Sequence, residues 1–179
     1  MSRILIISED FVKDNSEIDE NVDMKLLNPT IWRCQIQYLQ NILGTKLYNS
    51  ILAKIDADTL TGDYLTLVDD YCADCLLNYV MFEVQVPLLY KFRDKNVSKK
   101  SSDNAQPIDF KEHRYLKDFY KDKAEFFAKR IAAYLCENEE LFTEYNTEDQ
   151  VDEVRPHDGK ATVSVYLGGD YNYNCKSHE

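Results

Sequence analysis

The scarcity of glycine and proline most constrains what this sequence can fold into. The 179 residues include only five Gly and four Pro. All-β folds need frequent turns, which Gly and Pro supply. Apolar residues recur instead at steps of three and four over several long stretches, which is the spacing of an amphipathic helix. The sequence therefore predicts a mainly α fold, a small bundle of about four helices.

The stretch NPTIWRCQIQYLQNILGTKLY indicates where one helix begins and ends. Asn28 can cap a helix whose first residue is Pro29, because the N–H that proline lacks has no partner at that position. Gly44 fits the position just after the helix, where a glycine lets the chain turn at little steric cost. A second helix is predicted from the apolar residues between Leu47 and Ile55.

Two further helices are predicted downstream. One follows Gly62 and ends by Pro87, because proline disfavours helix at the residue before it. The segment VQVPLLYKF is predicted to form a short strand or a kinked extension of this helix. Residues 93–107 are charged and Ser-rich, which is typical of an exposed loop. A long helix then covers about 109–136. Its expected apolar stripe consists of Phe110, Leu116, Phe119, Tyr120, Phe127, Ile131, Tyr134 and Leu135.

The two ends of the chain have different patterns. Ile4 to Ile7 is a short strand or an extended arm, and residues 14–23 are a polar acidic loop. Residues 1–145 are predicted to form the helical domain and residues 146–179 a β-prone C-terminal tail. In the tail, apolar residues alternate with polar ones at strand spacing. A detached strand gains most by joining another chain. The candidate interface residues in the tail are therefore Val163, Val165, Tyr166 and Leu167. Trp32 lies one step off the apolar row of the first helix and is a further candidate for an edge or subunit contact, with ordinary core packing as the favoured alternative.

Charge restricts the partners. The net charge of −11 repels phosphate, so tight binding to nucleic acid or to anionic lipid is not expected. The apolar run at the N-terminus is too short for a signal peptide or a membrane span, so we expect the protein to stay in the cytoplasm where it is made. Five cysteines, an odd number, are typical of free thiols in a reducing compartment.

The sequence contains only weak matches to motifs for metal binding, redox chemistry or calcium binding. Cys72 and Cys75 have C-x-x-C spacing but fall inside a predicted helix, so inert buried thiols are favoured over a metal site or redox chemistry. Asp19, Asn21 and Asp23 resemble the start of a calcium loop that lacks the required Gly and Glu, which favours Asx turns. We predict no catalytic, cofactor-binding or metal-binding residues, and a protein that is not an enzyme.

Several short sequence motifs occur in the same order as in a known family of proteins. Residues 21–52, with Gln37-Tyr38 and Leu43-Gly44 followed by Leu47-Tyr48, resemble the N-terminal signature of head–tail connector (adaptor) proteins of tailed bacteriophages, particularly crAss-like phages. The resemblance continues to the helix at residues 117–135 and covers roughly residues 10–145. These are structural positions and not catalytic motifs.

The resemblance implies a structural virion protein. Such proteins are helical bundles that form rings, usually twelve-fold, below the portal and extend the DNA channel. The implied partners are other copies of the chain, the portal protein and the next tail or ring protein, with DNA passing through unbound and no membrane. The implied location is the head–tail junction of the virion, assembled in the host cytoplasm. Two alternatives stay open: a cytoplasmic helical adaptor that binds a protein partner, and a small C-x-x-C thiol or metal protein.

Overall fold

A computed structural model describes residues 3–93, 96–99, 109–145, 152 and 154 of the chain. Most of these residues are helical. The α-helices are α1 (Glu9–Asp14), α2 (Met24–Cys34), α3 (Gln40–Leu43), α4 (Thr45–Asp56), α5 (Asp63–Leu67), α6 (Ala73–Leu89) and α7 (Phe110–Glu137). Two π-helical turns, η1 (Gln35–Leu39) and η2 (Val68–Cys72), make α2–α3 and α5–α6 continuous, and a 3₁₀ turn, η3 (Glu139–Leu141), follows α7. The strands are β1 (Tyr90–Arg93) and β2 (Asn96–Lys99).

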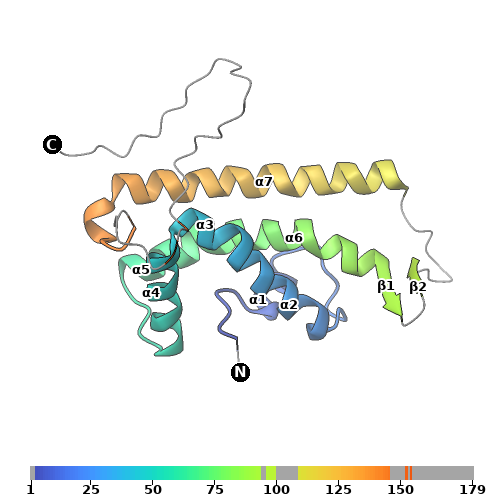
Figure 1. Cartoon of the computed structure of the whole chain (residues 1–179), viewed down its shortest axis with the longest axis horizontal. Helices are drawn as coiled ribbons and strands as arrows, with labels where there is room; N and C mark the ends of the chain where they lie inside the picture. Colours follow the sequence, from blue (N-terminus) through green and yellow to red (C-terminus); the bar gives the residue numbers. More distant parts are fainter. Residues whose placement is uncertain (1–2, 94–95, 100–108, 146–151, 153, 155–179) are drawn as a thin grey trace, which may run out of the picture.

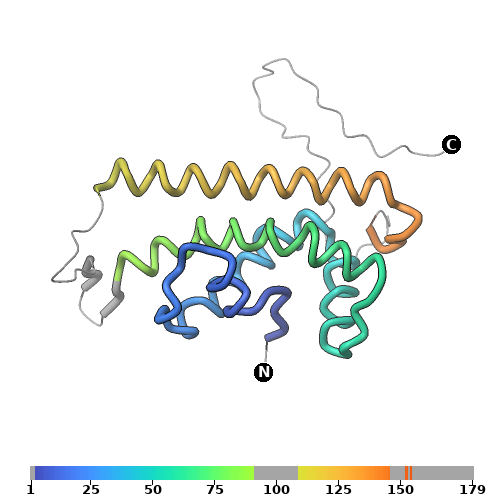
Figure 2. Tube along the Cα trace, turned by 180° about the vertical axis from the view of Figure 1, so that it is seen from behind, coloured from blue at the N-terminus to red at the C-terminus, as the bar shows by residue number. Residues whose placement is uncertain are grey.

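The helices form layers around α6. Helix α7 runs antiparallel to α6 along one side of the molecule, and α1, α2 and α4 lie on the other side (Figures 1 and 2). The prediction of a mainly helical bundle is confirmed. The strand predicted at residues 163–167 of the C-terminal extension lies outside the described residues.

Buried side chains from all layers form one core. Helix α6 is buried on nearly every side, as expected for a central helix. Helix α7 contributes one face only. The largest fully buried apolar side chains are Leu27, Ile31, Leu39, Leu43, Leu47, Ile51, Leu67, Leu76, Ile131, Leu135 and Phe142.

The first long helix begins earlier than its sequence predicts. Asp23, rather than Asn28, is the N-cap: its side chain accepts a hydrogen bond from the backbone N–H of Lys25 at 2.9 Å. Pro29 lies inside the helix and not at its first position. Proline costs the helix a backbone hydrogen bond there, and burial of Leu27 against the core outweighs that loss.

The predicted break at Gly44 is confirmed. Gly44 ends α3 and begins α4 with φ 74° and ψ 155°, a conformation that only glycine adopts readily. Part of the segment assigned to the tail contacts this corner. The Thr45 hydroxyl donates to Asp152 Oδ1 at 2.6 Å, and the Thr45 N–H donates to the Val154 carbonyl at 3.4 Å.

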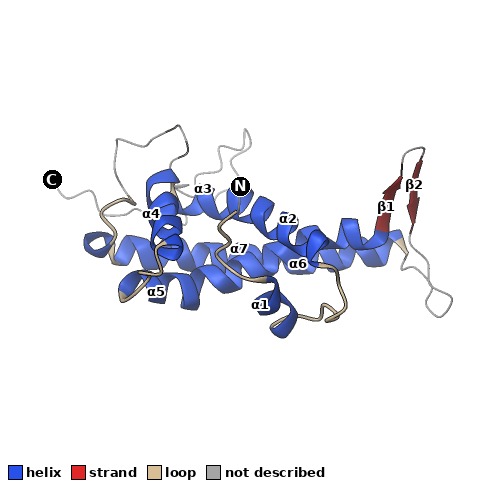
Figure 3. Ribbon diagram, turned by 90° about the horizontal axis from the view of Figure 1, so that it is seen from below, coloured by secondary structure: helices blue, strands red, loops and turns tan. Residues whose placement is uncertain are grey.

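Helix α6 continues past its predicted end. Pro87 lies inside α6, and the helix continues to Leu89. The burial of Val84 and neighbouring residues outweighs the local cost of proline. Residues 93–107 were predicted to be loop, but part of this stretch pairs. Strands β1 and β2 form an antiparallel hairpin in which Tyr90 lies opposite Lys99, and the hairpin projects from the end of α6 (Figure 3).

Among the described residues, one helix has the length and apolar composition of a membrane span. It is the continuous helix Asp63–Leu89, and 56% of its most apolar window is buried inside the protein. Exposed carboxylates at Asp69 and Asp70 lie along the same helix. A central core helix has the same composition, so this feature is weak evidence for a membrane segment.

The N-terminal residues form an extended arm rather than a strand. Gln35, which is buried, donates from Nε2 to the Ile4 carbonyl at 2.9 Å and accepts at Oε1 from the Ile6 N–H at 3.2 Å. Its Nε2 also lies 3.0 Å from the Tyr48 hydroxyl. Helix α1, which apolar spacing alone does not predict, follows the arm and is capped by Ser8.

Tyrosine–carboxylate hydrogen bonds join distant segments of the bundle. Tyr120 on α7 donates to Glu17 at 2.8 Å, and Tyr64 on α5 donates to Glu144 at 2.7 Å. The Tyr120 hydrogen bond holds the pKa of Glu17 below its ordinary value. Burial raises the pKa of Glu144, but hydrogen bonds from Tyr64 and Ser50 and the nearby Lys54 outweigh it and lower the pKa overall.

These pKa shifts predict a loss of stability in acid. A carboxylate with a lowered folded-state pKa stabilises the fold above its unfolded pKa, and this contribution disappears as the pH falls below about 4.5. We expect the double variant Tyr64→Phe/Tyr120→Phe to lose less free energy of unfolding than the wild type between about pH 7 and about pH 3. Urea denaturation across this range measures the difference. Equal losses in both proteins would contradict the assignment.

Candidate interaction surface

Helix α7 carries a second line of apolar side chains on the face opposite the core. Tyr115, Phe119 and Phe126 are four and seven residues apart, about one and two helical turns, so they share one side of the helix. Their exposed fractions are 73%, 41% and 60%. Aromatic residues are enriched at protein interfaces. We call these three residues the outer stripe of α7.

The predicted apolar stripe of α7 is therefore partly wrong. Tyr120, Ile131 and Leu135 are buried as predicted. Phe110, Leu116 and Phe119 are exposed, because they lie on other sides of the helix or at its first turns. Ala124 was missed because its small side chain adds little to an apolar pattern, although it is fully buried beside Cys75.

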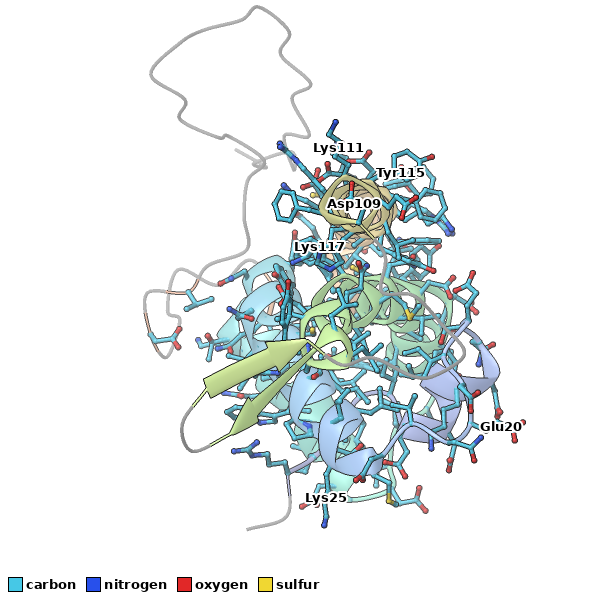
Figure 4. All side chains as sticks on the ribbon, turned by 90° about the vertical axis from the view of Figure 1, so that its right-hand side faces the viewer. Glu20, Lys25, Asp109, Lys111, Tyr115 and Lys117 are labelled. Atoms are coloured by element: carbon cyan, nitrogen blue, oxygen red, sulfur yellow. The ribbon has the colours of Figure 1, made fainter. Side chains whose placement is uncertain are left out.

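The N-terminal end of α7 is fixed by a cap formed by its own residues. Asp109 caps the helix in a capping box, in which Glu112 accepts from the Asp109 backbone N–H at 3.1 Å. A shallow surface hollow there is lined in part by Lys111, Glu112, Tyr115 and Leu116. Lys111 and Tyr115 point outward, whereas Lys117 points toward the other helices (Figure 4), where its Nζ lies 4.2 Å from the Phe82 ring centre.

The charge of α7 differs from that of the rest of the chain. Its 28 residues include seven Lys and Arg and five Asp and Glu, a net charge of +2 in a chain of −11. Some of these cations lie on the exposed aromatic rings: Lys123 Nζ is 4.2 Å from the ring centre of Phe119. Exposed carboxylates lie beside the stripe as well, at Asp118 and Asp122. The outer stripe is thus an aromatic surface with a border of mixed charge.

Of the candidate interface residues predicted from the sequence, Trp32 alone lies within the described residues. Trp32 is half-buried on α2, and the guanidinium carbon of Arg3 lies 3.8 Å from the centre of its ring. This contact ties the N-terminal arm to α2. Val163, Val165, Tyr166 and Leu167 lie outside the described residues.

The cysteines and the acidic loop, which were considered as sites for chemistry, have structural roles. Cys72 and Cys75 are free, buried thiols inside the helix, as expected. Burial raises the pKa of both, which disfavours the reactive thiolate. In the acidic loop, Asp19 accepts from the Asn21 backbone N–H at 2.8 Å, which is the expected Asx turn. No group of three or more potential metal ligands occurs among the described residues.

Comparison with known proteins gives one match. The model of a family of unknown function, DUF6712, matches residues 39–155, more than half of the sequence. The chain belongs to the DUF6712 family. No curated protein and no solved structure matches the chain.

The DUF6712 region contains most of the architecture described above. It begins at the end of η1 and includes the Gly44 corner, the central helix α6 and all of α7. It also extends past residue 145 to include Asp152 and Val154, which contact the corner at Thr45. Trp32 and the N-terminal arm lie before the matched region.

Proposed function

We propose that this DUF6712 protein is a structural subunit of a bacteriophage head–tail connector. In this proposal the chain forms a ring, usually twelve-fold in the resembled proteins, below the portal and extends the channel through which DNA leaves. Its partners are neighbouring copies, the portal protein and the next tail or ring protein. It acts as a building block and not as an enzyme, and its place is the head–tail junction.

The observation that carries this proposal is the outer stripe of α7. A subunit of a ring needs surface for its neighbours beyond the face that fills its own core, and α7 has apolar side chains on both faces. The resemblance, over residues 10–145, overlaps most of the DUF6712 match. The net charge of −11 also suits a channel wall that does not retain DNA, since an acidic surface repels phosphate.

Co-sedimentation with the portal protein tests the proposal. The purified chain is expected to sediment with portal particles at a fixed ratio of copies. If the two proteins sediment separately at every concentration, the connector assignment is wrong. A helical adaptor that binds a different protein, which the same outer stripe also suits, would then be the better reading.

A further inference from the structure

The β1–β2 hairpin has two open edges. It is the only sheet among the described residues, so each strand has a partner on one side alone. An open edge presents unpaired backbone N–H and C=O groups, and a hairpin of two strands is only marginally stable by itself in water. The hairpin also projects from the end of α6, away from the layers of the bundle (Figure 3). A third strand can therefore reach this edge and would stabilise the hairpin.

The register of the hairpin identifies the backbone groups at the open edge of β2. Arg93 lies opposite Asn96, and two residues connect them. In a hairpin with a two-residue connection, this pair exchanges hydrogen bonds. The pattern alternates along antiparallel strands, so the N–H and C=O groups of Val97 and Lys99 point away from β1. These are the groups that a third strand would pair with.

The predicted strand of the tail has the properties of that third strand. Residues 163–167 alternate between apolar and polar and carry no charge. The sequence of the hairpin, residues 90–99, contains four Lys and Arg and one Asp. Pairing two hairpins edge to edge would bring like charges together, which is unfavourable, whereas an uncharged strand avoids this cost. The hairpin edge is therefore better suited to the tail strand than to a second hairpin.

The position of the tail favours the hairpin of a different copy. The tail is held at the α3–α4 corner, where Asp152 and Val154 contact Thr45. That corner lies toward the α5 end of the molecule, whereas the hairpin lies beyond the other end of α6 (Figures 1 and 3). Helix α6 alone is about 25 Å long, and the chain from Val154 to Val163 spans about 30 Å when fully extended. The tail strand would reach its own hairpin only through a taut link.

We propose that residues 163–167 of one copy add as a third strand to β2 of a neighbouring copy. This inference rests on the proposed ring function and deepens it, because it names a contact between neighbours. Backbone hydrogen bonds to the edge of β2 supply the binding. The donating and accepting surfaces are different parts of identical chains, so the contact is head-to-tail, which is the type of contact that closes into rings.

Proline substitutions on each side test the contact in the full chain. Ser164→Pro/Val165→Pro removes an N–H from each edge of the tail strand, because neighbouring residues of a strand point to opposite edges. Val97→Pro removes an N–H at the open edge of β2, where proline is tolerated. Each variant is expected to weaken self-association at least tenfold, measured by analytical ultracentrifugation.

Two matched variants are the controls. Asn172→Pro/Tyr173→Pro places two prolines in the same tail but outside the predicted strand, and Val97→Thr keeps both the backbone N–H and a β-branched side chain. Both controls are expected to associate like the wild type. Circular dichroism should show the same helical content in all of these variants, because none of the substitutions lies in a helix that the structure describes.

A mixture of the two weakened variants shows whether the strand is donated between copies. The Val97→Pro protein keeps an intact tail strand, and the Ser164→Pro/Val165→Pro protein keeps an intact hairpin. An equimolar mixture is expected to form dimers with one copy of each and nothing larger, at a concentration where each variant alone is monomeric. A strand that binds the hairpin of its own chain would give no dimers in the mixture.

Three results would overturn the contact: a wild type that stays monomeric at all concentrations, weakened association in neither proline variant, or a mixture that stays monomeric. Portal co-sedimentation separates this inference from the proposed function. A Ser164→Pro/Val165→Pro protein that self-associates normally and sediments with the portal keeps the function and loses the strand contact. If that protein self-associates normally but no longer sediments with the portal, the tail strand binds the portal instead.

Discussion

Replacing Phe142 by alanine is expected to lower the free energy of unfolding by about 3–5 kcal/mol. Phe142 is only 1% exposed, although it lies beyond the last long helix. Its ring meets that of Tyr64 edge to face, with the ring centres 5.3 Å apart, and lies 5.9 Å from the ring of Tyr134. Removing the ring leaves a cavity between α5 and the end of α7, and chemical denaturation measures the loss.

Leu141 is the matched control for Phe142. It is the preceding residue, it is also large and apolar, and its exposed fraction is 45%. Leu141→Ala should change the free energy of unfolding by less than about 0.5 kcal/mol, as is usual at surface positions. If the two alanine variants are equally stable, the segment after α7 does not pack on the core as described.

The second large effect is expected at the corner between α3 and α4. Gly44→Ala should cost about 3 kcal/mol, because φ 74° with ψ 155° is nearly inaccessible to a residue with a Cβ. Gly44 is also buried, so the corner has little room to relax. A change there displaces Thr45, whose hydroxyl and backbone N–H donate hydrogen bonds to Asp152 and Val154.

Gly62→Ala provides the comparison. Gly62 also has a positive φ, of 60°, but it is exposed, and an added Cβ would meet no described atom within 4 Å. We expect Gly62→Ala to cost about 1 kcal/mol, since the exposed turn can adjust. The two thermal unfolding curves should therefore differ clearly. A Gly44→Ala protein as stable as Gly62→Ala would show that the corner is not a rigid element.

Local sequence rules located the helices better than their ends. The break at Gly44 follows from local chemistry and was predicted, because glycine turns the chain at little steric cost. Pro29 and Pro87 were misread, because burial of neighbours such as Leu27 and Val84 outweighs the cost of a proline inside a helix. The β1–β2 hairpin was missed because strand pairing depends on a partner strand rather than on local periodicity.

The candidate surface was harder to predict for a related reason. Helical periodicity marks apolar positions but does not say which ones face the core when a helix is apolar on two sides. Phe119 and Tyr120 are neighbours in sequence, yet only Tyr120 is buried. The position of α6 decides which face of α7 is buried, and the sequence of α7 alone does not give it. Once that is known, Tyr115, Phe119 and Phe126 emerge as one line.

Electron micrographs of the purified chain mixed with its portal protein test the central claim most directly. The account predicts closed rings, coaxial with the portal and stacked on one end of it, with an open central channel. Individual particles that leave the portal undecorated would contradict it.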